Sequence, residues 1–294
     1  MAKKCYKGFN PDMTCRDFQY EEGKEYETDR ANLCECGFHA CEAPLDVFGY
    51  YPPVNDNGEL NKFHEVELEE ISDEKSDDTK VVAKKIKIGA ELNFFGLAKA
   101  HVEWVKSRVE KDKTATNTGF RSAATNTGFQ SVATNTGGQS VATNTGDYSV
   151  ATNTGGQSVA TNTGCLSVAT NTGDRSAATN TGFRSVATNT GDRSVATSTG
   201  KRSVATNTGC LSVATNTGEN SIAVAWGIDS KAMAAMGSYI VIADWRWNEK
   251  KAEWKFRGAK MHVVDGKTIK PNVFYMLENG KFVEAENQGN SKEN

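Results

Sequence analysis

Residues 151–159 read Ala-Thr-Asn-Thr-Gly-Gly-Gln-Ser-Val, and this nine-residue unit decides the fold because the chain repeats it without a break. Twelve such units follow one another from residue 115 to residue 222. Their Ala-Thr-Asn-Thr-Gly part varies once, at Ser198. Self-similarity at a short fixed period is typical of a solenoid, in which each repeat packs only against its neighbours.

Each unit has the composition of one strand and one turn. Its Val and Thr residues favour a strand, and Gly followed by two variable residues favours a bend. Nine residues are too few for a full coil, whereas two units form a flat coil with two faces. Twelve units therefore predict six coils, stacked over about 29 Å at the usual spacing of strands.

The alternation of side chains along a strand leaves two choices for the inside of the solenoid. One phase of the unit carries Val, Thr and Thr, and the other carries Ser, Ala and Asn. The first phase continues as Ile222, Val224 and Trp226, so we expect it to point inward. The alternative buries Ser, Ala and Asn and leaves an outward Thr-x-Thr array, which resembles those of ice-binding proteins. The turns lack the regular Asp of calcium-binding nonapeptide rolls, which excludes calcium.

The whole chain is predicted to be mainly β, a nonapeptide-repeat β-solenoid with two repeats per coil. An α+β domain precedes it and a β-hairpin cap follows it. We expect a helix near residues 94–109 to cover the first coil. The segments we expect are an α+β domain at 1–92, a capping helix and linker at 93–113, the solenoid at 114–237, the cap at 238–286 and a disordered tail at 287–294.

Candidate binding residues lie at the solenoid turns and in the cap. Because two units form a coil, Arg175 and Arg193 are expected on one edge, and Arg184 and Arg202 on the other. Basic turns with aromatic neighbours suit a nucleic-acid backbone, but nearby Asp residues favour a solvated edge. The cap tryptophans either cover the last coil or form a hot spot for a partner. The full set is Arg175, Arg184, Arg193, Arg202, Phe120, Phe129, Tyr148, Phe183, Trp245, Trp247 and Trp254.

A cluster of possible metal ligands falls within eight residues: Cys34, Cys36, His39 and Cys41. Its spacing is not a usual zinc pattern, because four ligands this close cannot all point inward from one strand. We therefore expect small core and turn residues here, with no metal and no cofactor.

The composition of the chain limits where the protein is expected to act and what it is expected to bind. The net charge is −3 and the mean hydropathy is −0.56. Residues 1–110 carry 23 acidic and 15 basic residues, whereas residues 111–222 carry 8 basic and 5 acidic ones. No apolar run approaches the roughly 18 residues of a membrane-spanning helix, and the first residues do not resemble a signal peptide. Seven cysteines, an odd number, then favour a reducing cytoplasm.

Three stretches near the start carry a resemblance: residues 6–9 (Tyr-Lys-Gly-Phe), residues 15–21 and residues 37–48. They resemble an uncharacterised domain family that is widespread in phages and prophages and that has no established activity. The resemblance covers about residues 3–110. The order of these motifs also faintly resembles ADP-ribosyltransferase-like folds. That second resemblance implies Tyr6, His39, Tyr50 and Glu67 as catalytic candidates, although no motif fixes their roles.

A second region, residues 220–234, resembles the head repeats of trimeric autotransporter adhesins and of some phage fibres. Those repeats are longer and less regular than nine residues, and the chain shows neither the coiled-coil stalk nor the anchor of such adhesins.

These observations favour a non-enzymatic phage accessory protein over a catalyst. We expect it to bind a host protein or nucleoprotein complex in the host cytoplasm, and so to inhibit a host defence system. Nucleic acid alone is not favoured, a membrane is not expected, and a homodimer or homotrimer is open. One alternative is a virion fibre or decoration component, and the other is an ADP-ribosyltransferase-like enzyme in the first domain.

Overall fold

The computed structural model describes residues 2–55, 57–74, 76, 78–108 and 114–285. The chain forms two compact units, residues 1–108 and residues 109–294. Strands account for 47% of the residues and helices for 8%, so the fold is mainly β. The expected disordered tail at 287–294 and the linker residues 109–113 lie outside the described residues.

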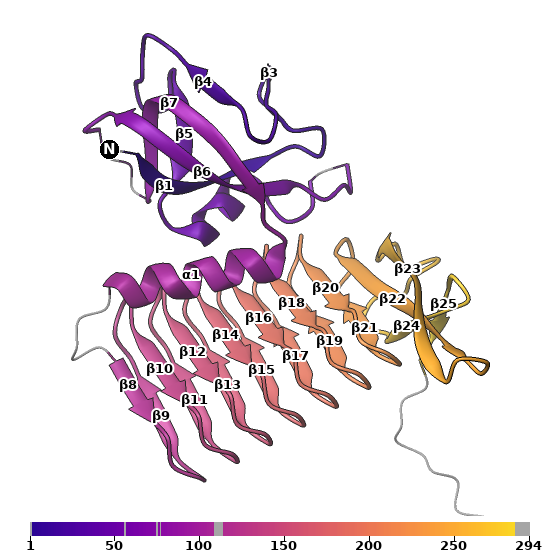
Figure 1. Ribbon diagram of the computed structural model, residues 1–294. Helices are drawn as coiled ribbons and strands as arrows, with labels where there is room; N and C mark the ends of the chain where they lie inside the picture. Colours follow the sequence, from indigo (N-terminus) through magenta and orange to yellow (C-terminus); the bar gives the residue numbers. More distant parts are fainter. Residues whose placement is uncertain (1, 56, 75, 77, 109–113, 286–294) are drawn as a thin grey trace, which may run out of the picture. The chain divides into compact units, whose positions relative to one another are not determined.

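The first unit is an antiparallel β structure with a short 3-10 helix, η1, and one α-helix, α1 (Figure 1). Its elements in chain order are β1 (Lys3–Phe9), β2 (Thr14–Cys15), β3 (Phe18–Gln19), β4 (Glu25–Glu27), β5 (Phe38–Cys41), η1 (Pro44–Gly49), β6 (Lys62–Ile71), β7 (Lys80–Glu91) and α1 (Phe94–Arg108).

The main sheet of this unit has the strand order β4-β7-β5-β1-β6, and β6 also pairs with β7. The extra pairing closes β7, β5, β1 and β6 into a ring around an apolar core that includes Phe9, Leu68 and Ile86. The helix α1 packs against η1, and the ring of Phe94 lies 6.4 Å from that of Phe48. The expectation that this helix covers the first coil stays a prediction.

The second unit is a β-solenoid, as the repeat predicts, and it has about seven turns. Its strands alternate between two sheets. The β8 sheet contains β8 (Thr114–Asn117), β10 (Val132–Asn135), β12 (Val150–Asn153), β14 (Val168–Asn171), β16 (Val186–Asn189), β18 (Val204–Asn207), β20 (Ile222–Ala225), β22 (Tyr239–Asn248) and β23 (Glu253–Val263). The β9 sheet contains β9 (Ala123–Asn126), β11 (Val141–Asn144), β13 (Val159–Asn162), β15 (Ala177–Asn180), β17 (Val195–Ser198), β19 (Val213–Asn216), β21 (Lys231–Ala234), β24 (Tyr275–Glu278) and β25 (Lys281–Glu284).

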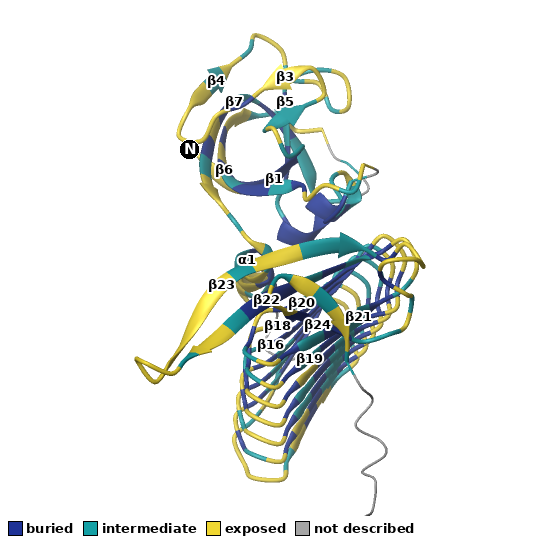
Figure 2. Ribbon diagram, turned by 90° about the vertical axis from the view of Figure 1, so that its right-hand side faces the viewer, coloured by how far each residue is buried: buried dark blue, intermediate teal, exposed yellow. Residues whose placement is uncertain are grey.

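The pairing register confirms that two repeats form one coil. Each solenoid strand pairs in parallel with the strand two units further along, so Thr152 lies opposite Thr170 and Thr161 opposite Thr179. The six coils of regular units are followed by a seventh in which Ile222–Ala225 and Lys231–Ala234 replace the usual strands. Figure 2 shows buried residues along the strands and exposed turns along both edges.

The predicted inside of the solenoid is wrong, and the alternative phase is the observed one. From Ala133 onward the Ala, Asn and Ser residues of the units are buried, whereas the threonines of the β9 sheet are half-buried or exposed. The space between the two sheets therefore holds small side chains. Trp226, which suggested the opposite phase, is exposed and points outward with the threonines.

The buried asparagines close the turns. The Oδ1 atom of Asn162 accepts the N–H of Gly164, and its Nδ2 atom donates to the carbonyl of Ser149 at 2.9 Å. The serines form a second ladder, in which the N–H of Ser158 donates to the Oγ atom of Ser176 at 3.0 Å. These bonds satisfy polar groups that would otherwise destabilise a narrow interior.

From the second coil onward, close stacking requires the invariant glycine of each unit. A Cβ atom on Gly164 would collide with the carbonyl oxygen of Gly146, one coil earlier. The residue with a positive φ is instead the second variable one, such as Leu166 at 52°. Any substitution of the invariant glycine therefore displaces backbone rather than a flexible side chain.

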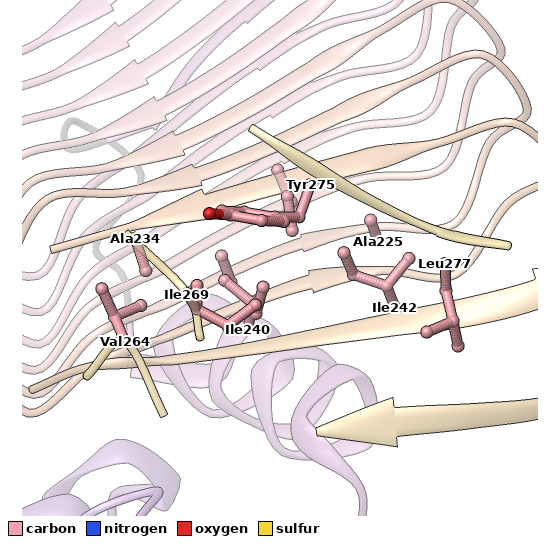
Figure 3. Packing of buried hydrophobic residues seen from close by; sticks show 11 residues of the cluster. Ala225, Ala234, Ile240, Ile242, Val264, Ile269, Tyr275 and Leu277 are labelled. Carbon is pink, nitrogen blue, oxygen red and sulfur yellow. The ribbon is translucent and has the colours of Figure 1, made fainter. Parts of the chain in front are cut away.

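The last coil is closed by two hairpins. The strand β22 continues the β8 sheet in parallel with β20 and turns back as β23, while β24 and β25 extend the β9 sheet. An apolar cluster fills the end of the solenoid, where Ile240, Tyr275 and Leu277 meet the alanines of the last strands (Figure 3).

An Asp-Gly pair favours a hairpin turn, but the pair at residues 265–266 of the cap does not form one. Asp265 and Gly266 do not join two paired strands, because β23 and β24 lie in different sheets. The carboxylate of Asp265 instead accepts the N–H groups of Lys267, Thr268 and Ile269 and so shapes the crossing loop.

Candidate functional site

The hairpin of β22 and β23 gathers aromatic side chains on one face. Its register places Trp245 opposite Phe256 and Trp247 opposite Trp254. Because side chains alternate along a strand, these four residues share a face, and Arg246 and Lys255 occupy the other. The ring centroids lie 5.3 Å apart in the first aromatic pair and 5.7 Å apart in the second. We call these four residues with Trp226 the aromatic face.

The aromatic face is open to solvent and anchored to the last coil. Trp226, Trp247, Trp254 and Phe256 are between 39% and 46% exposed. The indole N–H of Trp245 donates to the carbonyl of Trp226 at 2.9 Å, and the rings of Trp226 and Phe256 lie 5.4 Å apart. The aromatic face is therefore positioned by strand pairing and by a hydrogen bond, although it faces water.

Carboxylates and tryptophans share one hollow beside the hairpin. This hollow of about 270 Å³ is lined by Trp245, Trp247 and Trp254 together with Asp229 and Glu278. A third carboxylate there, Asp244, accepts the N–H of Gly280 at 2.7 Å. The hollow suits an apolar or basic side chain of a partner better than a phosphate.

The solenoid turns place the arginines on the two edges as expected. The N–H of Arg175 donates to the carbonyl of Asp192 on one edge, and the N–H of Arg184 donates to that of Lys201 on the other. Arg175 and Arg193 line a hollow of about 430 Å³ with Asp174, Asp192 and Phe120. Acidic groups thus separate these cations.

The opposite edge carries most of the aromatic turn residues. The guanidinium of Arg184 lies 4.7 Å from the ring of Phe183, and that of Arg202 lies 6.0 Å from the same ring. The rings of Phe129 and Tyr148 are 5.4 Å apart. These local stacks occupy the arginine faces, so neither edge presents a continuous basic stripe.

A pocket of about 780 Å³ opens in the first unit. It brings together Tyr6, His39 and Tyr50, three of the four residues that the enzyme resemblance implies. The fourth, Glu67, is exposed and lines a different hollow with Glu69 and Lys87. The complete catalytic set is therefore not assembled in one place.

The surroundings of His39 in this pocket favour the neutral form of its imidazole. Burial lowers the pKa of His39, and the cations Lys7, Lys80 and Arg16 lower it further. The Nε2 atom of His39 accepts the N–H of Cys34 at 2.9 Å. Burial, together with a hydrogen bond to Asp78, raises the pKa of Tyr50 above its usual range.

The four possible metal ligands do not converge. Cys34 is exposed and its Sγ atom accepts a hydrogen bond from the ammonium of Lys80 at 3.1 Å, whereas Cys41 is buried on β5. Burial raises the pKa of the Cys41 thiol well above its usual value. Among the residues that the structure describes, no group of three His, Cys, Asp or Glu side chains is placed to hold a metal ion.

Sequence reasoning missed Phe256 in the aromatic face and Lys7 and Lys80 in the pocket. The alternation Trp254-Lys-Phe256 was a signal for the first, since both rings fall on one face of a strand. No local pattern joins Lys7 to Lys80, because they reach the same pocket from β1 and β7.

The comparison with known protein families gives a match within the first unit. Residues 3–100 match the family described as a domain of unknown function (DUF7666). No curated protein and no solved structure matched the chain. In the described part of the chain, no helix combines the length and the apolar character needed to span a membrane. The molecule is thus a β-solenoid that follows a DUF7666 domain.

Proposed function

We propose that this chain is a non-enzymatic binding protein whose aromatic face binds a partner protein. The observation that carries the proposal is the aromatic face, in which four of the five rings are each more than a third exposed. Exposed clusters of this kind mark interaction sites, and Trp is the residue most enriched among binding hot spots. The solenoid acts as the rigid support of this surface.

A protein partner suits this surface better than a nucleic acid. Residues 239–263 carry six Lys and Arg against three Asp and Glu, which suits nucleic acid in number. However, Asp229, Asp244 and Glu278 lie beside the tryptophans and repel phosphates where the bases would stack. The same carboxylates attract a basic or amide-rich segment of a protein.

The biological setting belongs to the same proposal. The resemblance of the first domain to proteins of phages and prophages supports a phage accessory protein. All seven cysteines are free thiols, which suits the reducing cytoplasm of a host cell. We propose that the partner is a host protein, alone or within a nucleoprotein complex, and that binding blunts a host defence system without any cofactor.

The test compares three forms of the full chain as baits in host-cell extract: wild type, a Trp247→Ala/Trp254→Ala variant and a Phe120→Ala/Phe129→Ala control. The control removes two rings of the solenoid turns that are more exposed than the two tryptophans. We expect one host protein, near one copy per bait, to be retained by the wild type and the control and lost by the hairpin variant. Binding is then repeated with the purified host protein and followed by light scattering.

Four results would overturn the proposal. Equal capture by all three baits would remove the role of the aromatic face, and capture of nucleic acid alone would change the class of partner. A bare homotrimer, or association with virion proteins only, would favour the fibre or decoration alternative. Turnover of nicotinamide dinucleotide by the chain would favour the enzyme alternative.

The outward threonines favour a second candidate function, ice binding. In the β9 sheet, each strand from β9 to β19 carries one threonine that is not buried, and a second one follows two residues later, just after the strand. The strands of this sheet pair in register. This gives a grid of hydroxyl and methyl groups spaced about 4.8 Å across strands and about 6.6 Å along them. A regular grid of this kind can order water in the way an ice surface does.

Thermal hysteresis of the purified chain tests the second candidate. An ice-binding chain would lower the freezing point below the melting point and shape ice crystals. A Thr161→Tyr/Thr179→Tyr variant in the middle of the grid would lose this effect, whereas Gln157→Tyr at a turn would keep it. Freezing behaviour identical to that of an ordinary protein at equal concentration would remove this candidate.

A further inference from the structure

The pocket of the first unit has the size of a site for a small organic ligand. Its volume of about 780 Å³ lies within the range of roughly 300–1,000 Å³ that is usual for such sites. Side chains from β1, β5 and β7 line it, together with residues around β2, β3 and η1. One wall of the pocket thus belongs to the closed ring of strands, and the other walls come from the loops and short elements of the same unit.

A buried ammonium group faces this pocket. Lys7 is only 6% exposed, and its Nζ atom donates to the carbonyl of His39 at 2.9 Å and contacts the Sγ atom of Cys15 at 3.4 Å. These contacts use two of its three donors. In the part of the chain that the structure describes, Lys7 forms no ion pair with a carboxylate. A buried charge without a counter-ion is costly, and a bound anion would compensate it.

Two further cations line the same pocket. The ammonium of Lys80 lies 4.8 Å from the ring centroid of Tyr50, and Arg16 is exposed at the opening. Neither forms an ion pair within the described residues. The carboxylates of the lining, such as Asp17 and Glu27, are exposed, and Glu27 is paired with Lys85 at 3.1 Å. The interior is therefore cationic and the acidic groups are at its rim.

Aromatic rings form another part of the wall. Phe18, Tyr20, Tyr26 and Phe38 pack edge to face or tilted, with Phe18 4.7 Å from Tyr20 and 5.3 Å from Tyr26. Phe18 nevertheless remains 45% exposed. An exposed ring held by its neighbours offers a surface on which a flat heterocycle can stack.

We propose that this pocket binds a nucleoside phosphate, with the phosphate held by Lys7 and Lys80 and the base stacked at Phe18. The chemistry of the wall requires both parts of such a ligand, because an inorganic anion would leave the aromatic wall uncovered. An uncharged ring would leave the buried ammonium without a counter-ion. This site is independent of the aromatic face in the second unit.

Isothermal titration of the full chain with ADP tests the proposal, with adenosine and pyrophosphate as the two partial ligands. We expect ADP to bind more tightly than either. Lys80→Met should weaken ADP binding about tenfold or more, since it removes a charge-assisted hydrogen bond. Lys87→Met is the matched control, because Lys87 lies on the same strand, is paired with Glu25 and lines another hollow.

A second variant separates the role of the ring from that of the charge. Phe18→Ala should weaken ADP binding while leaving pyrophosphate binding unchanged. Melting curves confirm that each variant is folded before titration. The proposal is overturned if ADP does not bind to the wild type, if pyrophosphate binds as tightly as ADP, or if Lys80→Met and Lys87→Met bind ADP alike.

Discussion

At the scale of single residues, the solenoid is held by polar side chains that point inward. Each buried asparagine both closes its turn and bonds to the preceding coil, as Asn180 does through Gly182 and Ser167. Removing such a side chain would leave several buried backbone groups without partners. The repeated Asn is thus a structural requirement of a narrow coil and not a surface preference.

Ser198 provides a natural test, because it replaces the asparagine of its unit. Its Oγ atom is buried and has no hydrogen-bond partner among the described residues, while Asn180 and Asn216 lie on either side of it in the sheet. Ser198→Asn should restore the missing bonds and stabilise the fold by about 1–3 kcal/mol. Chemical denaturation measures the change, and Thr199→Asn, at the exposed neighbouring position, should have no effect. A lower midpoint for Ser198→Asn would contradict the assigned ladder.

Gly164 and Gly156 form a matched pair within two adjacent turns. A Cβ atom on Gly164 would collide with the backbone of the preceding coil, whereas one on Gly156 would meet only the carbonyl of Asp174 at 3.5 Å. We expect Gly164→Ala to cost about 1–3 kcal/mol or more, because backbone must shift, and Gly156→Ala to cost little. Gly164→Val should be worse still. Equal melting temperatures for the two alanine variants would argue against stacked coils.

At the scale of elements, the repeat length predicts that two units form a coil, but it does not predict which side chains point into the coil. Val and Thr have high strand propensity, which reflects a fit to a pleated surface and not a place in the core. Ile222 and Trp226 suggested an apolar inside, yet Trp226 packs outward against the hairpin ring of Phe256. The interior is narrow, so only small side chains such as those of Ala, Asn and Ser fit inside it. A single sequence does not reveal this narrowness.

The two candidate sites differ in how far the sequence predicts them. Trp245, Trp247 and Trp254 flank a recognisable turn, so the sequence identifies most of the aromatic face. The sequence does not predict the pocket, and it singles out three of the lining residues, Tyr6, His39 and Tyr50, only through the enzyme resemblance. Its cations depend on the ring closure of β6 with β7, which is a long-range pairing without a local signal.

The crossing loop after β23 carries a prediction about pH. Hydrogen bonds from three backbone N–H groups lower the pKa of Asp265 to about 2, below the value near 3.9 expected in an unfolded chain. Its stabilising effect is therefore complete above about pH 4 and is lost as the pH falls toward 2. Asp265→Asn keeps the acceptor but removes the charge, so it should be less stable than the wild type at pH 7, and the difference should disappear as the pH falls through 2.

Thermal midpoints measured across this range check the prediction for Asp265. Asp29→Asn serves as the control, because Asp29 is exposed and accepts no hydrogen bond in the described part of the chain. A difference between wild type and Asp265→Asn that does not change with pH would show that the carboxylate charge does not stabilise the loop.

At the scale of the whole molecule, the two candidate binding sites lie outside the repeated strands. Identical strands give the solenoid its stability through contacts between neighbouring coils, as in other repeat proteins. The features that distinguish one surface from another lie in the turns, in the hairpin of β22 and β23, and in the pocket of the first unit. Every assignment of a solenoid residue to an edge or a face depends on the closure of one coil by two units.

That closure is measured most directly by crosslinking pairs of introduced cysteines with a short thiol-reactive reagent and mapping the products by mass spectrometry. The account predicts rapid crosslinking of Thr161→Cys with Thr179→Cys, which lie side by side on β13 and β15 at a strand spacing of about 4.8 Å. Thr161→Cys with Thr170→Cys should not link, because these residues lie in different sheets and point outward in opposite directions. Crosslinking of the second pair as fast as the first would contradict the two-unit coil.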